Sequence, residues 1–596
     1  MKRLAAIVTT SPQYVCSPYT VPGIFSARRY LTYQPGFLKV WQFIFCCPGT
    51  VIKKIILSFI ICCCLQVYVT GQQLGNTPRL IKKNGHTQLL IDEKPFLILG
   101  GETGNSSASE MGYMQLHWQK LQSMNLNAVL TPVYWELLEP EEGKFDFTLV
   151  DSLLSNARQH HLKLVLLWFG TWKNSMSCYV PLWMKKDPVR FKRTQDKNGR
   201  SQEIISCFSK PALEADIKAF TALMKYLRDK DGKDHTVIMV QVENEIGMLP
   251  TAREISKTAD KYFNEEVPAT LISYLKKNKD SLEGPLYEKW KQTGFTTQGN
   301  WQKIFGEGLA TDEIFQAWHY AKYANAVAAA GKAVYNLPMY VNAALNRPNV
   351  KPGDYPSAGP LPHVLDIWRA ATTAIDFFSP DFYNPDTKYW CDLYSKKNNP
   401  LFIPEMRLEP SCAAKVFYII GHYSGIGFSP FSIEDATGTL ASSLQKSYDV
   451  LQQLSPLING SEWLRMDGAL LDKTNPAQQI QMGDYQLKIS HDNALGWTPA
   501  SKDSIWSMAG ALIMQTGKDD FIIGGTGVVI TFTCTDTTRV ANIATADEIR
   551  YQNLKEIKGR RMNGDQDHQG RHIRIPEGQW GIQKVTMYTS PAKIND

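Results

Sequence analysis

The sequence predicts an α/β protein: a (β/α)8 barrel of the TIM type, followed by a smaller all-β, sandwich-like C-terminal domain. Two observations lead to this fold class. Between residues 84 and 455, short apolar runs alternate with helical stretches, as in a chain of βα units. After residue 456, short alternating runs are broken by Gly, Asp and Asn, which is typical of antiparallel strands. The length of 596 residues also exceeds what one hydrophobic core usually serves.

Eight runs qualify as barrel strands, and a long crossover interrupts their regular spacing. The expected strands are 96–100, 128–132, 163–169, 236–242, 339–342, 375–378, 401–403 and 427–431. The interval 248–337 is long for one crossover, so we expect extra helices there, placed over the barrel mouth. In such a barrel the chemistry belongs at the C-terminal ends of the strands.

The catalytic barrel is expected over residues 84–455 and the β domain over 470–596, with a linker near 456–475. Strands of the second domain are expected at 485–489, 511–515, 521–523, 528–533 and 583–588. Its tryptophans, Trp497, Trp506 and Trp580, are interpreted as core residues in preference to sugar-binding ones.

Residues 1–71 form an upstream extension followed by a signal peptide at about 51–71. Lys53 and Lys54 precede an apolar core, and cleavage is expected after Gly71. A membrane anchor is the alternative, but the apolar run is short for a span. A lipoprotein is less favoured, because bulky Ile61 precedes Cys62. We expect an exported protein, periplasmic or secreted, with no stable membrane span once the leader is removed. Residues 1–50 are interpreted as the product of a start site assigned too early.

The charge balance and the cysteines narrow the function classes. Seven of the 64 basic residues and none of the 57 acidic residues lie in residues 1–71, so the rest of the chain has 57 basic and 57 acidic residues and no net charge. Nucleic acid and anionic membranes are therefore not expected as partners. Six of the 11 cysteines lie in residues 1–71, and the other five lack the spacing of a zinc site. With scattered histidines and no phosphate loop, no metal or cofactor is expected.

Two glutamate motifs follow apolar runs that read as strands. One is QVENEIG at 241–247, and the other is PLFIPEM at 400–406. Two carboxylates at the ends of parallel strands are what glycoside hydrolysis requires. The first pattern does not separate Glu243 from Glu245 as the proton donor, and paired acids there could instead cap a helix. Asn244 between them favours catalysis, because its amide could hold a sugar hydroxyl beside the acid.

Tyr383 and Glu405 end neighbouring strands. Tyr383 could donate a hydrogen bond to Glu405 and keep it ionised while Glu245 stays protonated; alternatively, Tyr383 is a wall residue of the barrel. Two further strand ends supply candidate sugar contacts. Trp135 and Trp172 could stack on sugar faces, whereas Glu136, Lys173 and Asn174 could bind hydroxyls.

These motifs resemble glycoside hydrolase family 35. The run NLNAVLTPVYWELLEPEEGKFDF at 125–147 is similar to the family's pattern of a strand ending in Trp before an EP-x-x-G-x-[FY]-x-F segment. QVENEIG differs from the family's QVENEYG at one position. The stretches GGETGNSS, LWFGTWKNS and PFSIED look like a bacterial branch with a C-terminal β domain. The resemblance implies a retaining β-galactosidase with Glu245 as acid/base, Asn244 beside it, and Glu405 as nucleophile on the seventh strand.

The chain departs from that family where relatives line the sugar site. Glu136 stands where the family has Asn, and LWFGTWKNS replaces RPGPYICAEW. From the resemblance as a whole we expect an exo-acting β-galactosidase that removes terminal β-D-galactosyl residues. A galactosyl side chain of a plant or host glycan is the expected substrate. The alternatives are a β-glycosidase of another specificity (glucosidase, mannosidase or endo-glycanase) and a non-catalytic glycan-binding protein. The oligomeric state is left open.

Overall fold

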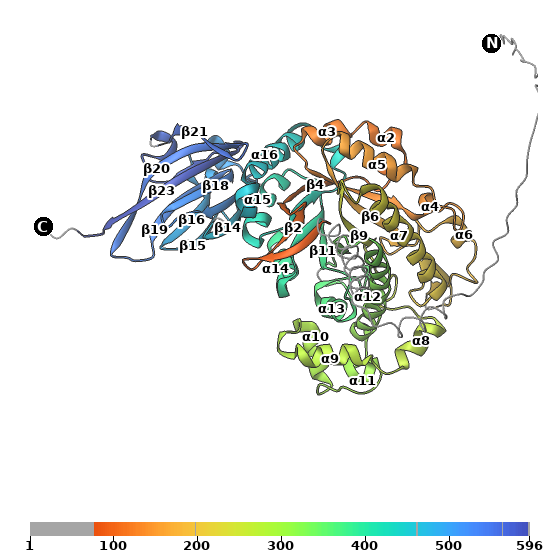
Figure 1. Ribbon diagram of the computed structural model, residues 1–596. Coiled ribbons are helices and arrows are strands. Elements are labelled where there is room, and N and C mark those ends of the chain that lie inside the picture. The colour runs from red at the N-terminus through yellow and green to blue at the C-terminus, as the bar shows by residue number, and fades with distance from the viewer. Residues whose placement is uncertain (1–76, 197, 348, 461–462, 563, 594–596) are drawn as a thin grey trace, which may run out of the picture. The chain divides into compact units, whose positions relative to one another are not determined.

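The computed structural model describes residues 77–196, 198–347, 349–460, 463–562 and 564–593 (Figure 1). The expected signal peptide and upstream extension, residues 1–71, lie outside the described residues. Among the described helices, none has both the length and the apolar character needed to cross a bilayer.

The central feature is a closed barrel of parallel strands. Around the barrel the order is β10-β11-β12-β13-β4-β5-β6-β9, and every neighbouring pair is parallel. In chain order the strands are β4 (Ile98–Glu102), β5 (Ala128–Tyr134), β6 (Lys163–Lys173), β9 (Val237–Asn244), β10 (Met339–Ala344), β11 (Phe377–Phe382), β12 (Phe402–Met406) and β13 (Gly427–Pro430). Each matches one of the eight runs predicted from the sequence, so the predicted barrel is confirmed.

Burial on both faces explains why these strands were readable as apolar runs. Strands β5, β9, β11 and β12 are buried at every position, because side chains fill the barrel inside and helices cover it outside. The long helix α12 (Leu309–Val334) packs against α7 (Lys210–Asp231) in that outer layer. Polar side chains are thereby displaced to the strand ends, where the candidate site lies.

Extra helices occupy the long crossover between β9 and β10, as predicted. They are α8 (Lys257–Asn264), α9 (Ala269–Lys277), α10 (Gly284–Gln292) and α11 (Trp301–Phe305), seen along the lower edge of Figure 1. Helix α9 packs against α13 (Leu365–Ala371), α10 against the turn Pro362–Val364, and α11 against α12. The insert is therefore attached to the outer helices of the barrel.

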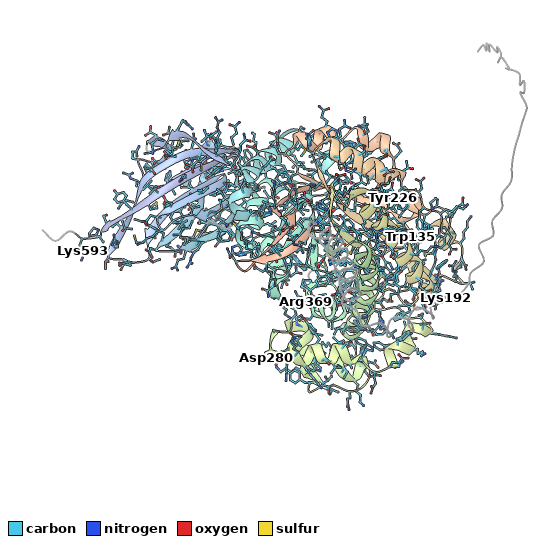
Figure 2. All side chains as sticks on the ribbon, viewed as in Figure 1. Trp135, Lys192, Tyr226, Asp280, Arg369 and Lys593 are labelled. Carbon is cyan, nitrogen blue, oxygen red and sulfur yellow. The ribbon has the colours of Figure 1, made fainter. Side chains whose placement is uncertain are left out.

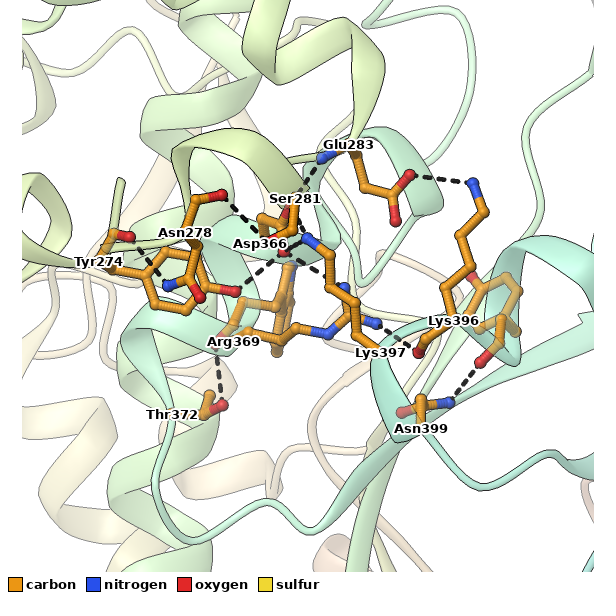
Figure 3. A network of polar contacts seen from close by, with 12 residues as sticks. Tyr274, Asn278, Ser281, Glu283, Asp366, Arg369, Thr372, Lys396, Lys397 and Asn399 are labelled. Atoms are coloured by element: carbon orange, nitrogen blue, oxygen red, sulfur yellow. Dashed lines mark hydrogen bonds and ion pairs between the residues drawn. The ribbon is translucent and has the colours of Figure 1, made fainter. Parts of the chain in front are cut away.

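A buried carboxylate anchors this insert (Figure 3). Asp366 on α13 accepts hydrogen bonds from the Tyr274 hydroxyl of α9 at 2.9 Å and from the Glu283 backbone N–H at 2.8 Å. Lys397 and Arg369 contact the same carboxylate, at 2.5 Å and 3.3 Å. One side chain thus ties α9, the start of α10 and the Lys397 turn together.

Two antiparallel sheets form the C-terminal domain. The six-stranded sheet has the order β14-β17-β18-β23-β20-β21, and the four-stranded sheet has the order β15-β16-β19-β22. The strands of the first sheet are β14 (Arg465–Leu471), β17 (Ala509–Gln515), β18 (Asp520–Thr526), β20 (Arg539–Gln552), β21 (Lys555–Arg561) and β23 (Gly581–Pro591). Those of the second are β15 (Ala477–Met482), β16 (Tyr485–His491), β19 (Val528–Cys534) and β22 (Ile573–Ile575). The predicted all-β domain is confirmed.

Strand β17 of the six-stranded sheet is buried on both faces. Along β17, Ala511 and Ile513 join the core of the β domain, whereas Leu512 and Met514 join the core of the barrel. This alternation follows the two-residue period of a strand. The second face rests on α15 (Cys412–Tyr423) and α16 (Gly438–Gly460). Residues 456–475, expected to form a linker, hold the last turn of α16 and strand β14.

Candidate active site

The carboxyl ends of four barrel strands bring four buried carboxyl groups together. Glu102 ends β4, Glu245 directly follows β9, Asp381 lies near the end of β11, and Glu405 lies near the end of β12. None exposes more than 5% of its surface. Asp381 and Glu405 are direct partners in the parallel register. Each of the four shifts the pKa of at least one of the others, so they form one electrostatic cluster.

Lys173 is the cation of this cluster. It ends β6, is buried, and its Nζ lies 5.1 Å from the centre of the Phe169 ring. Its charge lowers the pKa of Glu102, Glu245, Asp381 and Glu405 alike. Lys173 was predicted as a sugar contact, and the structure adds the role of counter-ion.

Glu405 is held by the tyrosine that the sequence suggested. The Tyr383 hydroxyl donates a hydrogen bond to Glu405 Oε1. Oε2 is buried without a hydrogen-bond partner among the described residues. Burial and the nearby Glu245 charge raise the pKa of Glu405 to about 7, although Lys173 and Tyr383 oppose them. One carboxylate oxygen of Glu405 is thus oriented by Tyr383, and the other has no partner among the described residues.

Glu245 is positioned through both its backbone and its side chain. Its backbone N–H donates to Asn342 Oδ1 at 2.9 Å, and its carbonyl accepts from the Ser175 N–H at 3.1 Å. Asn174 Nδ2 donates to Oε2. The φ angle of 45° is left-handed, a strained conformation that such bonds must hold. Burial raises the pKa of Glu245, which favours a protonated carboxyl.

Glu243 faces a different part of the barrel. Its carboxylate accepts a hydrogen bond from the Trp172 backbone N–H at 2.7 Å, and burial together with the nearby Asp216 charge raises the pKa of Glu243. Asp216 in turn accepts from Trp168 Nε1 at 2.9 Å and the Thr171 hydroxyl at 2.6 Å. The geometry therefore separates the two glutamates that the motif could not: Glu245 joins the carboxyl cluster and Glu243 braces β6.

Asn244 adds an unsatisfied amide beside Glu245. Both polar atoms of its side chain are buried and have no hydrogen-bond partner among the described residues. A buried amide without partners costs free energy unless a ligand supplies them. This agrees with the sequence-based expectation that Asn244 binds substrate.

The two tryptophans predicted to stack on sugar are enclosed by protein, which contradicts that role. Trp135 and Trp172 have 0% exposure. Trp135 Nε1 donates to Glu139 at 2.8 Å, and the residue is labelled in the barrel domain in Figure 2. Trp172 Nε1 donates to the Ile205 carbonyl at 3.2 Å, and its ring packs between Tyr320 and Tyr323. Both rings pack the barrel wall and leave no face for a sugar.

Glu136 lies at the rim, partly exposed, with its Oε2 3.3 Å from Lys185 Nζ.

Three acids near the site were not predicted from the sequence. Glu102 and Asp381 belong to the cluster, and Glu434, which follows β13, accepts hydrogen bonds from the Gly104 N–H at 2.8 Å and from Ser107. Each acid follows an apolar run, so a search of all eight strand ends could have found them.

Comparisons with known proteins agree with this geometry. Residues 110–305 match a family model described as β-galactosidase, of glycoside hydrolase family 42. Residues 444–574 match a domain of unknown function, DUF5597. The chain thus carries a β-galactosidase-like glycoside hydrolase barrel. These matches support no assignment to family 35 in particular, which stays a prediction.

Curated relatives match over short stretches. A β-galactosidase of Xanthomonas manihotis is 37% identical over 62 residues, 10% of each chain. The mouse β-galactosidase-1-like protein 3 is 29% identical over 180 residues, 28% of this chain and 25% of the relative. The chain therefore spans a quarter or less of the length of the curated relatives that it matches.

Solved structures similar to this chain include β-galactosidases. That of Bacillus circulans sp. alkalophilus has a TM-score of 0.43 and 14% identity, over 61% of this chain and 57% of that one. That of Rahnella sp. R3 has a TM-score of 0.42 and 15% identity, over 61% and 57%.

Proposed function

We propose that this protein is a retaining, exo-acting β-galactosidase that removes terminal β-D-galactosyl residues from glycans. One observation carries the proposal. Glu245 directly follows the fourth strand of the barrel and Glu405 lies near the end of the seventh. Both are buried in one cluster with Lys173 and are held by different partners. Two carboxyls with separate environments on either side of a scissile bond are the machinery of glycoside hydrolysis.

In the proposed first step, Glu405 Oε2 attacks the anomeric carbon while Glu245 protonates the glycosidic oxygen. The products are a covalent glycosyl-enzyme and a released alcohol. In the second step Glu245, now a carboxylate, takes a proton from water as the water displaces Glu405. Two displacements at one carbon retain the β configuration. Asn244 would bind a sugar hydroxyl beside Glu245 in both steps.

The proposal is tested by hydrolysis of an aryl β-galactoside. Glu245→Gln and Glu405→Gln should each lower kcat by about 10³-fold or more, because each removes the group on which one step depends. Glu243→Gln is the matched control: it is buried in the same motif, yet faces Trp172 and Asp216, and should stay near the wild-type rate. A near-wild-type rate for either of the first two variants would refute the assignment.

Specificity for galactose is part of the proposal and needs its own measurement. The match to a β-galactosidase family model supports it, whereas Glu136 and the LWFGTWKNS segment depart from the family 35 pattern. A panel of aryl β-galactoside, β-glucoside and β-mannoside should show the highest kcat/KM on the galactoside. A preference for the glucoside or mannoside would keep the mechanism and replace the sugar.

We further propose that the protein acts outside the cytoplasm, on galactosyl side chains of a plant or host glycan. The support is the leader-like sequence at 51–71 and the even charge balance of the rest of the chain. Mass spectrometry of the protein recovered from the host cell envelope or medium should find an N-terminus at Gln72. An N-terminus upstream of residue 50 would contradict the proposed cleavage after a leader at 51–71.

A further inference from the structure

Asp381 lies between the two proposed catalytic residues and has no role in the mechanism above. Its Oδ2 accepts a hydrogen bond of 2.5 Å from Asn342 Nδ2. The same amide, through its Oδ1, receives the backbone N–H of Glu245. Asp381 on β11 is paired in register with Glu405 on β12. One asparagine on β10 therefore fixes Asp381 and Glu245 relative to each other, beside the nucleophile.

Asp381 lies close enough to the Glu245 carboxyl to lower the pKa of Glu245, as a hydrogen-bond donor would. A carboxylate only accepts hydrogen bonds, so this contact requires a proton on at least one partner. Asp381 Oδ1 is shielded from solvent and accepts no hydrogen bond from the described residues. The contact with Glu245 is consequently the one that can satisfy it.

Counting charges shows which state the cluster can adopt. Four buried carboxyls face Lys173, and like charges at close range in a buried site cannot all be ionised. If Glu405 is ionised for attack, Lys173 balances it, and the other three must be mostly neutral. The groups that face Asp381 are Glu102, Glu245, Glu405, Lys173, Tyr340, Tyr383 and Tyr394.

We infer that Asp381 is a neutral carboxylic acid that donates a hydrogen bond to Glu245, acting as a positioning residue for the proposed acid/base. The inference rests on the proposed function. When Glu245 gives its proton to the glycosidic oxygen, Asp381 keeps its own proton, and its O–H then faces a carboxylate. A hydrogen bond to a charged acceptor is stronger than one to a neutral acceptor, so the bond favours the transition state and the glycosyl-enzyme. When Glu245 takes a proton from water, the bond returns to its weaker form.

The test uses the full-length protein with two substitutions of opposite expected effect. In Asp381→Asn the amide can still donate to Glu245 and accept from Asn342, so kcat/KM should stay within about threefold of wild type and both limbs of its pH profile should stay in place. Asp381→Ala removes the donor. It should lower kcat/KM by about 10- to 100-fold on a galactoside with an alkyl leaving group, the range for a hydrogen bond to a charged group.

The leaving group separates positioning from a general loss of structure. A nitrophenyl galactoside needs little help from an acid, so Asp381→Ala should cost it much less in the glycosylation step than it costs the alkyl galactoside. Equal losses on both substrates would point to a structural role and overturn the inference. So would an Asp381→Asn variant that loses about 100-fold or whose pH limbs move by more than about one unit, since an ionised Asp381 would then be needed.

A spectroscopic measurement keeps the inference independent of activity and of the folding of the alanine variant. The infrared difference spectrum of wild type minus Asp381→Asn at pH 7 should contain the carbonyl band of a protonated carboxyl. A carboxylate band in its place would overturn the inference. If wild type hydrolyses no aryl glycoside at all, the proposed function fails, whereas the infrared result still decides the state of Asp381.

Discussion

At the scale of single residues, Lys173 decides how much of Glu405 is available as a nucleophile. Burial and the neighbouring Glu245 raise the pKa of Glu405 to about 7, although Lys173 and Tyr383 each lower it. The nucleophile must be ionised, so activity should fall as the pH drops through this value. We therefore expect the acid limb of kcat/KM to have its midpoint near pH 7.

Replacing Lys173 by Met should move that limb upward. Without the ammonium group the ionised form of Glu405 loses a favourable partner, so its pKa rises and a higher pH is needed for the same activity. The expected displacement is about one pH unit or more, as for the loss of an opposite charge nearby. The measurement is the pH profile of kcat/KM on an aryl galactoside.

Lys173→Arg is the control, because it keeps the charge and should restore the limb toward its wild-type position. An unchanged limb in Lys173→Met, with a higher KM at all pH values, would show that Lys173 binds sugar and does not tune Glu405. Either result separates the role predicted from the sequence from the role that the cluster indicates.

The residue scale also shows what the sequence could predict. Glu405 and its partner Tyr383 were predicted correctly as neighbours, because both follow apolar runs on adjacent strands. The motif could not separate Glu243 from Glu245, because the direction of each side chain depends on the backbone at that residue. Both residues are left-handed, with φ angles of 61° and 45°, and they contact different partners. The Trp135 and Trp172 predictions were wrong because a strand end carries both wall and cleft positions, and neighbouring residues take opposite sides.

At the scale of elements, the apolar runs located all eight barrel strands, but not what fastens the insert of α8–α11 to the barrel. Asp366 supplies that fastening with contacts to Tyr274, Glu283 and Lys397 (Figure 3). The partners lie 92, 83 and 31 residues away along the chain, so no local pattern reveals them.

Removing this carboxylate should loosen the insert. Asp366→Ala leaves Lys397 and Arg369 partly buried without their anion, so we expect a loss of about 3 kcal/mol in the free energy of unfolding. Amide hydrogen exchange should rise in the segment 269–292. Glu142→Ala is the matched control: it breaks an exposed pair with Arg190 and should cost less than about 1 kcal/mol.

The anchor should also depend on pH, and the sign follows from Asp366. Burial alone would raise the pKa of Asp366, but hydrogen bonds from Lys397 and the Glu283 N–H hold it below the ordinary 3.8. A lowered pKa means that the stabilisation is present above pH 3.8 and is lost as the pH falls through the folded-state pKa. In Asp366→Asn this acid-dependent part of the stability should disappear; its persistence would show that another carboxyl is responsible.

At the scale of the whole molecule, the barrel and the β domain are joined by close packing of backbone on backbone. A Cβ atom added at Gly510 on β17 would lie 2.3 Å from the carbonyl oxygen of Ala414 on α15. At Gly421 on α15 it would lie 2.7 Å from the carbonyl oxygen of Asp467 on β14. The change in sequence pattern after Pro456 predicted a second domain there. It could not show a core shared with the barrel, because a strand face that packs on helices of the barrel has the same apolar pattern as one that packs inside the β domain.

Gly510→Ala tests whether this contact couples the two domains. The added methyl group meets backbone that cannot rotate away, so the sheet must move off α15, at an expected cost of about 1–3 kcal/mol. Since Leu512 and Met514 on the same strand belong to the core of the barrel, thermal inactivation of hydrolysis and calorimetric unfolding should shift together to lower temperature. Gly581→Ala on β23, where a Cβ atom meets nothing within 4 Å, should leave both unchanged. A calorimetric shift with unaltered inactivation would mean that the barrel keeps its active shape without the β domain, and that the packed face serves the β domain alone.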